Sequence, residues 1–334
     1  MMLSSSPLVS IIIPTYNRAK LLPRALESVL AQDYPHLEII VIDDASTDET
    51  PNVLKAFGDP RIQVFRHPEN KGHGAACETG IRCAKGELIA FLDSDDIWLP
   101  GKLGLQVAIF RQWPLVDFHF TNFRNINLVN GVEGDGFTQT RDGLALLQTV
   151  HVDTDLWIIQ SGMPQAMLQA MFIAQPTVML RHEVIATTGN FNSELRGAAD
   201  LELWWRIALS GFRFSFSRRP LMERYKDNQS TTSKVIEFSL WHIRALEICE
   251  ETAREAGRLD LIPPLNSARY RSWCGLVKEY TRVGRRREAL HAFSQALHYG
   301  FTPRLLLYGA LALGGAQTFS LARSIRRAVV GGSR

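Results

Sequence analysis

The stretch Gly86-Glu87-Leu88-Ile89-Ala90-Phe91-Leu92-Asp93-Ser94-Asp95-Asp96 joins a short apolar run to three carboxylates. Residues 88–92 have the length and composition of a strand that is buried on both faces. In open α/β sheets, ligands bind just beyond the carboxyl ends of such strands. We therefore expect the three aspartates to lie at a sheet edge that a ligand can reach.

Three carboxylates so close together suit a hard divalent cation. Carboxylate oxygens are the ligands that Mg²⁺ or Mn²⁺ prefers when phosphate oxygens fill the remaining positions, and no thiolate or imidazole stands beside them to favour zinc. The alternative is a solvated acidic turn that caps a helix beginning near Pro100. An isolated Asp-x-Asp does not distinguish a cation site from a helix-capping turn. The sequence that precedes it has to be considered as well.

Composition places the chain among soluble globular proteins. It has 334 residues, of which 46% are hydrophobic and 21% charged, so we expect one main domain and a smaller one. No basic leader precedes the apolar run at residues 8–13, which is too short for a signal peptide or membrane anchor and predicts a cytoplasmic protein. The four cysteines have no metal-binding spacing, and we expect them to be reduced.

Strand and helix patterns alternate through the first hundred residues. Apolar runs at residues 8–13, 37–42, 62–66 and 88–92 predict strands, and residues 20–32, 74–84 and a segment opened by Pro51 predict helices. This alternation indicates βαβ crossovers and a mainly parallel, Rossmann-like sheet flanked by helices. The chain has neither Gly-x-Gly-x-x-Gly after the first strand nor a P-loop, which disfavours a dinucleotide-dependent dehydrogenase.

Four sequence blocks together resemble the family 2 glycosyltransferases of the GT-A fold. They are Ser10-Ile11-Ile12-Ile13-Pro14-Thr15-Tyr16-Asn17-Arg18, Val41-Ile42-Asp43-Asp44-Ala45-Ser46-Thr47-Asp48, Asn70-Lys71-Gly72 and Asp93-Ser94-Asp95-Asp96. The blocks have the family's order and spacing, and the resemblance is close over residues 8 to about 112. It implies a nucleotide-sugar donor, with UDP as the expected nucleotide.

The resemblance also implies roles for individual residues. Pro14, Thr15 and Tyr16 would border the nucleoside, and Asp44 would accept a hydrogen bond from the base. Asp93 and Asp95 would hold Mn²⁺ or Mg²⁺ on the diphosphate. The physical chemistry agrees, because a tyrosine face stacks on bases and an anionic diphosphate needs a cation between itself and carboxylates. The remaining residues that the resemblance assigns to substrate binding are Arg18, Asp43, Lys71, Gly72 and Ser94.

A second block, Ala199-Asp200-Leu201-Glu202-Leu203-Trp204-Trp205-Arg206, predicts a helix with Asp200 in its first turn. It is similar to the family's Glu-Asp followed by a Leu-Trp-x-Arg helix, in which the Asp is the general base for the acceptor hydroxyl. Ala199 stands where the family has Glu, and Asp200 as a mere helix cap is the alternative. Residues 223–230 occupy the place of a His-containing loop; Arg224 or Lys226 would then face the phosphates, unless the segment is a solvated loop.

The remaining segments give weaker signals. Residues 116–122 and 175–181 predict strands, and residues 137–173 predict helices and loops in which Met163, Met167 and Met171 are core residues rather than an acceptor groove. Residues 235–256, 267–283 and 286–299 predict helices, with a break at residues 259–264. Residues 284–297 are similar to the second half of a tetratricopeptide-type helix pair, and because one unit is not an array, we interpret this helix as packing.

We therefore expect a catalytic domain at residues 1–233, with a donor half at 8–112 and an acceptor half at 113–233, and a helical region at 234–334. The predicted activity is metal-dependent, inverting sugar transfer to a carbohydrate or lipid-linked hydroxyl acceptor, with no nucleic-acid partner. The alternative is a catalytically silent nucleotide-sugar-binding or scaffold protein of the same fold. Residues 282–334 hold nine arginines and one acidic residue, so peripheral contact of the basic C-terminus with the inner membrane face is a further expectation.

Overall fold

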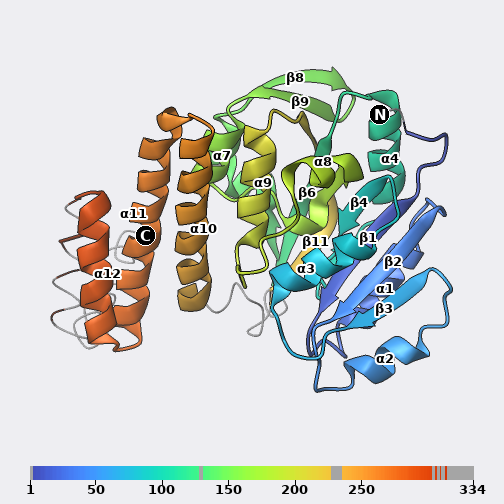
Figure 1. The fold of residues 1–334 in the computed structure, drawn as a ribbon, viewed down its shortest axis with the longest axis horizontal. Helices are drawn as coiled ribbons and strands as arrows, with labels where there is room; N and C mark the ends of the chain where they lie inside the picture. Colours follow the sequence, from blue (N-terminus) through green and yellow to red (C-terminus); the bar gives the residue numbers. More distant parts are fainter. Residues whose placement is uncertain are drawn as a thin grey trace, which may run out of the picture. The chain divides into compact units, whose positions relative to one another are not determined.

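The computed structural model describes residues 3–127, 131–226 and 235–302, and residues 305, 306, 309 and 313 beyond them. The chain forms two compact units, Met1–Asn228 and Gln229–Arg334 (Figure 1). The boundary expected at residue 233 falls in the undescribed segment 227–234, and the functional division of the chain stays a prediction.

The first unit is an α/β structure built on one large sheet. Its strands are β1 (Val9–Thr15), β2 (Leu37–Asp43), β3 (Ile62–Arg66), β4 (Leu88–Phe91), β5 (Ile97–Trp98), β6 (Phe118–Asn127), β7 (Gly131–Asp135), β8 (Gln148–Asp153), β9 (Leu156–Ser161), β10 (Val178–Arg181) and β11 (Phe214–Lys226). Its helices are α1 (Leu22–Leu30), α2 (Thr50–Ala56), α3 (His73–Cys83), α4 (Lys102–Gln112), α5 (Gly136–Gln139), α6 (Arg141–Leu144), α7 (Met163–Gln169), α8 (His182–Thr188) and α9 (Ala199–Leu209).

The sheet has the strand order β3-β2-β1-β4-β10-β6-β11-β9-β8, with β5 paired to β11 and β7 to β6. The pairs β3–β2, β2–β1 and β1–β4 are parallel, as the βαβ pattern of the first hundred residues predicts. The pair β6–β11 is parallel as well. Strand β10 runs antiparallel to both of its neighbours, β4 and β6, and joins the two parallel parts into one sheet. The carboxyl ends of β1, β2 and β4 therefore lie at the same edge.

The two faces of β1, β2 and β4 are both covered, which explains their uninterrupted apolar runs. On one face, Ile39 and Val41 belong to a core that includes α1 and α4. On the other, Ile40 and Ile42 pack against Ala76 of α3. Alternate residues of one strand thus enter different cores, and a shift of one residue in register would exchange them.

Three predictions about this unit are corrected by the structure. Within residues 137–173, expected to be helices and loops, β8 and β9 form an antiparallel hairpin. The predicted strand at residues 175–181 begins with a short 3₁₀ turn, Gln175–Thr177, and becomes β10 at Val178. Residues 223–226, considered as a solvated loop, belong to β11, which pairs with β5, β6 and β9.

The second unit is helical, as expected, with α10 (Val235–Glu255), α11 (Ile262–Arg282) and α12 (Arg286–Tyr299). The break predicted at residues 259–264 is shorter than expected, because Pro263 and Pro264 occupy the first turn of α11, where a missing N–H removes no helical hydrogen bond. The part of the basic C-terminus beyond residue 313, for which we expect membrane contact, lies outside the described residues. Among the residues described, no helix is long and apolar enough to cross a membrane.

Candidate active site

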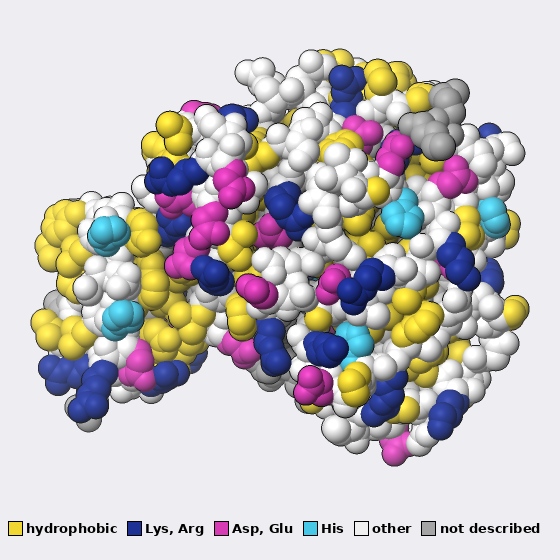
Figure 2. All heavy atoms as spheres, in the orientation of Figure 1, with side chains coloured by type: hydrophobic (Ala, Val, Ile, Leu, Met, Phe, Trp, Pro, Cys, Tyr) yellow, Lys and Arg dark blue, Asp and Glu magenta, His cyan; other side chains and the backbone are white. Residues whose placement is uncertain are grey.

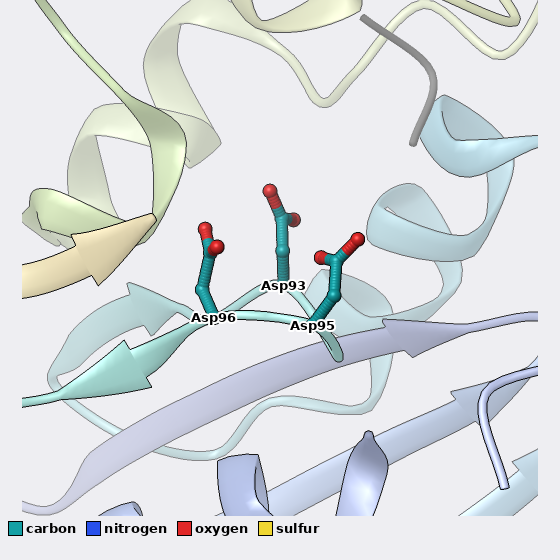
Figure 3. A group of neighbouring side chains, drawn as sticks. All are labelled: Asp93, Asp95 and Asp96. Carbon is teal, nitrogen blue, oxygen red and sulfur yellow. The ribbon is translucent and has the colours of Figure 1, made fainter. Parts of the chain in front are cut away.

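The loop that follows β4 gathers three carboxylates. β4 ends at Phe91, and the backbone N–H of Asp96 then donates to the carbonyl of Asp93 at 3.0 Å, which turns the chain back toward β5. One ligand oxygen each of Asp93, Asp95 and Asp96 lies within 4.8 Å of the others. Figure 3 shows their side chains projecting to the same side of this loop. The placement agrees with the sheet-edge site that the sequence predicts.

The electrostatics of this cluster suit a bound cation. Asp96 is buried and accepts the backbone N–H of Tyr225 at 2.9 Å. Its pKa is raised well above the usual value, first by burial and then by the charges of Asp93 and Asp95. Arg18 contacts Asp95 at 3.4 Å, and His73 Nε2 lies 3.1 Å from Asp93 Oδ1. An all-oxygen set of mutually repelling carboxylates is the donor chemistry that Mg²⁺ or Mn²⁺ requires.

Asp200 lies in the first turn of α9, in the same site. Ala198, the residue before this helix, adopts a left-handed conformation with φ of 56° that non-glycine residues seldom take. Burial raises the pKa of the Asp200 carboxyl, Asp93 raises it further, and the nearby charge of His73 opposes both. The charges of Asp93 and His73 thus act on Asp200, although more than a hundred residues separate Asp93 from Asp200 in sequence.

The close approach of α3 to the segment before α9 depends on a glycine. A Cβ atom at Gly74 would lie 2.6 Å from the carbonyl oxygen of Leu195 and 3.1 Å from Cβ of Ala199. Both distances are shorter than ordinary contacts, so only glycine fits there without movement. Through this contact, the first turn of α3 fixes the start of the helix that carries Asp200.

Arg224 faces the same carboxylates from β11. Burial lowers the pKa of its guanidinium, and the charges of Asp96, Asp93 and Asp200 oppose that shift. Its Nε donates to Asn125 Oδ1 at 2.9 Å, and its guanidinium carbon lies 4.9 Å from the centre of the Phe123 ring. The side chain is thus held in place by a strand, a hydrogen bond and an aromatic face. Lys226 closes the same strand, and its side chain lies outside the described residues.

Asp43 ends β2 and Asp44 follows it, and both carboxylates bind groups within the protein. Asp43 binds Arg66 at 2.7 Å and the backbone N–H of Ser46 at 2.9 Å. Asp44, which is buried, accepts the backbone N–H groups of Lys71 at 2.9 Å and Gly72 at 2.8 Å.

His67 adds a further contact to Asp44, with Nδ1 2.7 Å from a carboxylate oxygen. The carboxylate of Asp44 therefore shapes the loop between β3 and α3. Its predicted contact with a nucleotide base stays a prediction.

The other residues assigned to the donor site lie around the same sheet edge. Pro14 and Thr15 end β1 and are buried, whereas the side chain of Tyr16 is 43% exposed, so its ring is available for stacking. Ser94 is buried between the aspartates of the cluster. Gly72 has a φ of 93°, a conformation that favours glycine, and immediately precedes α3.

Two features of the site were not predicted from sequence. His73 begins α3 and contacts both Asp93 and the buried Cys77, whose Sγ lies 3.8 Å from His73 Nδ1 and accepts a hydrogen bond from Gln175. The other feature is a small apolar pocket beside Asp200. It is lined by Met167, Ala170, Met171, Phe172, Ile173, Asp200, Leu201 and Trp204.

Neither feature carries a local signal. The spacing of His73 and Cys77 is that of an ordinary helix face, and Met167 and Met171 were expected to be core residues. Met167 is indeed buried, but it also helps to line the pocket, whereas Met171 is 39% exposed and is not a core residue.

The fold and site define a GT-A-like protein with an acidic cluster at the sheet edge where β1, β2 and β4 end. S. aureus TarS in complex with UDP-GlcNAc superimposes with a TM-score of 0.59 at 17% identity, covering 94% of this chain and 92% of that one. A mannosyltransferase from Pyrobaculum calidifontis in complex with GDP-Man and Mn²⁺ gives a TM-score of 0.57 at 20% identity, covering 95% and 84%.

Sequence comparison identifies the family. Residues 10–157 match the model of glycosyl transferase family 2. A putative teichuronic acid biosynthesis glycosyltransferase of Bacillus subtilis is 31% identical over 230 residues, which are 68% of this chain and 82% of that protein. An Escherichia coli UDP-Glc:alpha-D-GlcNAc-diphosphoundecaprenol beta-1,3-glucosyltransferase is 39% identical over 36% of this chain and 47% of its own length. The chain belongs to glycosyl transferase family 2.

Several of these matches are partial. The chain spans between 31% and 47% of the length of the first four curated relatives that it matches. The matched part in each of them is at most 60% of this chain.

Proposed function

We propose that this protein is a metal-dependent, inverting glycosyltransferase that moves a sugar from a UDP-sugar to a hydroxyl group of a carbohydrate or lipid-linked acceptor. The observation that carries the proposal is the cluster of Asp93, Asp95 and Asp96 together with Asp200, whose carboxyl is close enough to Asp93 for their charges to interact. Such a site pairs a cation-binding cluster for a diphosphate with a separate carboxylate for a proton. A solvated acidic turn that only caps a helix would not require Asp200, which belongs to α9, to lie near it.

The donor side is assigned to the strands that precede the cluster. Tyr16 offers an exposed ring at the end of β1 for the nucleoside, beside Pro14 and Thr15. Support for a nucleotide sugar comes from TarS, whose complex contains UDP-GlcNAc, and from the E. coli relative, which is named for UDP-Glc. The archaeal neighbour contains GDP-Man, which carries guanine in place of uracil. The identity of the nucleotide base therefore has to be measured with a panel of nucleotide sugars.

Asp93 and Asp95 are the residues that would hold Mn²⁺ or Mg²⁺. A divalent cation there would neutralise the diphosphate and stabilise its negative charge as the bond to the sugar breaks. Support comes from the all-oxygen donor set and from the Mn²⁺ in the archaeal neighbour. Arg224 is positioned to add positive charge on the same side, in place of the histidine that the family's loop supplies.

Asp200 is the residue proposed to accept the proton. The acceptor oxygen attacks the anomeric carbon, the bond from that carbon to the diphosphate oxygen breaks, and the hydroxyl proton passes to the Asp200 carboxylate. A single displacement of this kind inverts the anomeric centre. The raised pKa of Asp200 makes it a stronger base than an exposed aspartate, which favours proton transfer in the transition state.

The acceptor is proposed to belong to surface polysaccharide or glycoconjugate synthesis at the cytoplasmic face. The supporting names are those of relatives for teichuronic acid and for colanic acid biosynthesis, and of the enzyme that acts on a diphosphoundecaprenol-linked sugar. The acceptor-side segment from β6 to α9 is the part of the unit where their specificities would differ.

The test replaces Asp200 with Asn, which keeps the size and capping ability of the side chain but removes its basicity. With a donor identified from a nucleotide-sugar panel in the presence of Mn²⁺, transfer should fall on the order of 10²-fold or more, while donor affinity changes little. Asp142→Asn is a matched control, because Asp142 lies in the first turn of α6 and its side chain is 80% exposed.

Near-normal transfer by Asp200→Asn would move the base to another residue. A wild-type chain that binds UDP with Mn²⁺ but neither transfers nor hydrolyses any donor in the panel would support the catalytically silent alternative. These two outcomes differ in which protein fails, so they can be told apart.

A further inference from the structure

The turn between α11 and α12 presents a run of exposed arginines. Every residue from 282 to 287 is exposed, and four of the six are arginines, interrupted only by Val283 and Gly284. Figure 2 shows Lys and Arg side chains gathered at this end of α11 and α12. The turn lies in the described part of the helical unit, apart from the basic residues near the C-terminus.

The arginines stand where they weaken the helix that follows. Arg286 and Arg287 occupy the first turn of α12, beside the positive end of the helix dipole, where cations are unfavourable. Arg285 holds the N-cap position and makes no side-chain capping hydrogen bond, although Ser, Thr, Asp or Asn would cap better. The stability of α12 therefore does not explain why arginines stand at its N-terminus. Binding of an external anion would explain them.

Only part of the positive charge is neutralised within the unit. Arg282 binds Glu279 at 2.7 Å and Arg285 binds Glu288 at 2.8 Å, each from a side chain that is more than half exposed. Among the described residues, Arg286 and Arg287 form no ion pair. The turn thus keeps a surplus of charge that faces solvent.

Apolar surface adjoins the arginines. Val283, at the tip of the turn, is 46% exposed. Next to it is a groove whose lining joins apolar side chains of α10 and α11 to Arg282 and Arg285, with Glu237 and Glu279 also present. Its apolar members are Val235, Ile236, Leu240 and Tyr280. Cations beside exposed aliphatic groups suit a surface that is anionic outside and hydrocarbon beneath, whereas nucleic acid would favour exposed aromatic rings.

We propose that this arginine turn, residues 282–287, docks on the anionic face of a lipid membrane. The arginines contact lipid phosphates, and Val283 enters the interfacial region. The inference goes beyond the proposed activity and does not depend on it, although a lipid-linked acceptor would give such docking a use. Each arginine near an anionic surface contributes roughly 1 kcal/mol of binding free energy.

The test measures binding of the full chain to vesicles with roughly 30% phosphatidylglycerol in phosphatidylcholine, and to phosphatidylcholine alone, at low salt. The double variant Arg286→Gln/Arg287→Gln should bind the anionic vesicles about 30-fold more weakly, from two contributions of roughly 1 kcal/mol. Because it removes cations from a helix N-terminus, the same variant should melt at an equal or higher temperature, which also shows that it folds.

The matched control is Arg254→Gln/Arg258→Gln, which removes the same charge from exposed positions elsewhere in the unit, where both arginines are ion-paired. Its affinity for the vesicles should stay within a few-fold of wild type. If both double variants lose the same affinity for anionic vesicles, the net charge of the protein alone explains the binding, and this would overturn the proposal. So would a wild-type chain that ignores anionic vesicles, or one that binds single-stranded nucleic acid instead. Donor hydrolysis in solution should be the same in all variants.

Discussion

Replacing Gly74 with alanine tests how the site is assembled. Gly74 lies in the first turn of α3, and an added Cβ would stand 2.6 Å from the carbonyl oxygen of Leu195. Carbon and oxygen atoms in contact are ordinarily about 3.3 Å apart or more, so roughly 0.7 Å of movement is needed. The obstacle is backbone rather than the end of a flexible side chain, and the segment from Leu195 to Asp200 must move as a unit.

The expected effect on activity follows from that displacement. A misplacement of about 1 Å can lower a rate about 10²-fold. The smaller shift expected here should lower transfer by roughly 10- to 100-fold, or about 1.4 to 2.7 kcal/mol of transition-state stabilisation. Overpacking of a close contact should also lower the free energy of unfolding by roughly 1–3 kcal/mol.

Two assays measure these effects, namely steady-state transfer and urea unfolding at the same temperature. Gly58→Ala is the control, because a Cβ at Gly58 meets nothing within 4 Å in the same unit. This control should keep the wild-type rate. If Gly74→Ala also transfers at the wild-type rate and unfolds at the wild-type urea concentration, the contact does not position Asp200, and our account of the site is wrong.

Further predictions concern the cation cluster, the arginine on β11 and a buried histidine. Asp95→Asn should abolish most Mn²⁺-dependent affinity for UDP and leave the far-UV spectrum unchanged, because an anionic ligand is lost; calorimetric titration that shows unaltered Mn²⁺ dependence would remove Asp95 from the metal site. Arg224→Gln should weaken UDP roughly 10-fold but leave uridine unaffected, whereas Arg218→Gln on the same strand, whose guanidinium lies over Trp157 at 4.8 Å, should change neither; equal effects on uridine and UDP would contradict a phosphate contact. Burial and then the charge of Lys102 lower the pKa of His119 to about 3, below its unfolded value, so the stability that it contributes is present above about pH 6.5 and is lost as the pH falls toward 3. Between pH 8 and pH 5 this loss is roughly 2 kcal/mol in urea unfolding, and His119→Gln should show a smaller pH dependence; an unchanged dependence would mean that the folded protein accommodates the proton.

The first hundred residues were predicted well because their signals are local. The runs 37–42 and 62–66 match β2 and β3 to within one residue. Apolar residues of β2 enter two cores at once, whereas β3 is an edge strand on which Val64 and Phe65 are exposed. The β8–β9 hairpin was missed for the opposite reason. Most residues of β8 are exposed and polar, and Trp157 of β9 is held by stacking on Phe216 of the distant strand β11, at 5.7 Å between ring centres. No window of sequence contains that partner.

The part of the site that depends on local sequence signals was predicted, and the part that depends on distant partners was not. The aspartates after β4 follow directly from a strand ending at a sheet edge, and Asp200 from a helix beginning. The hydrogen bonds from Lys71 and Gly72 to Asp44 join loops that are far apart in sequence, so the internal use of Asp44 was not visible. Arg224 was recognised as a cation, but its strand contains Pro220 and two shifts of register, which disguise the extended conformation.

The reversed strand β10 has a consequence for how the polypeptide is made. β4 is complete at residue 91, yet its second neighbour in the sheet is β10, which is not synthesised until residue 181. During those ninety residues of translation, the β4 edge of the nascent β3-β2-β1-β4 sheet has no partner strand, and an unpaired edge invites pairing with other chains. We expect a fragment that ends at residue 157, where the family match ends, to aggregate on the ribosome or in isolation, and one extended past β11 to fold.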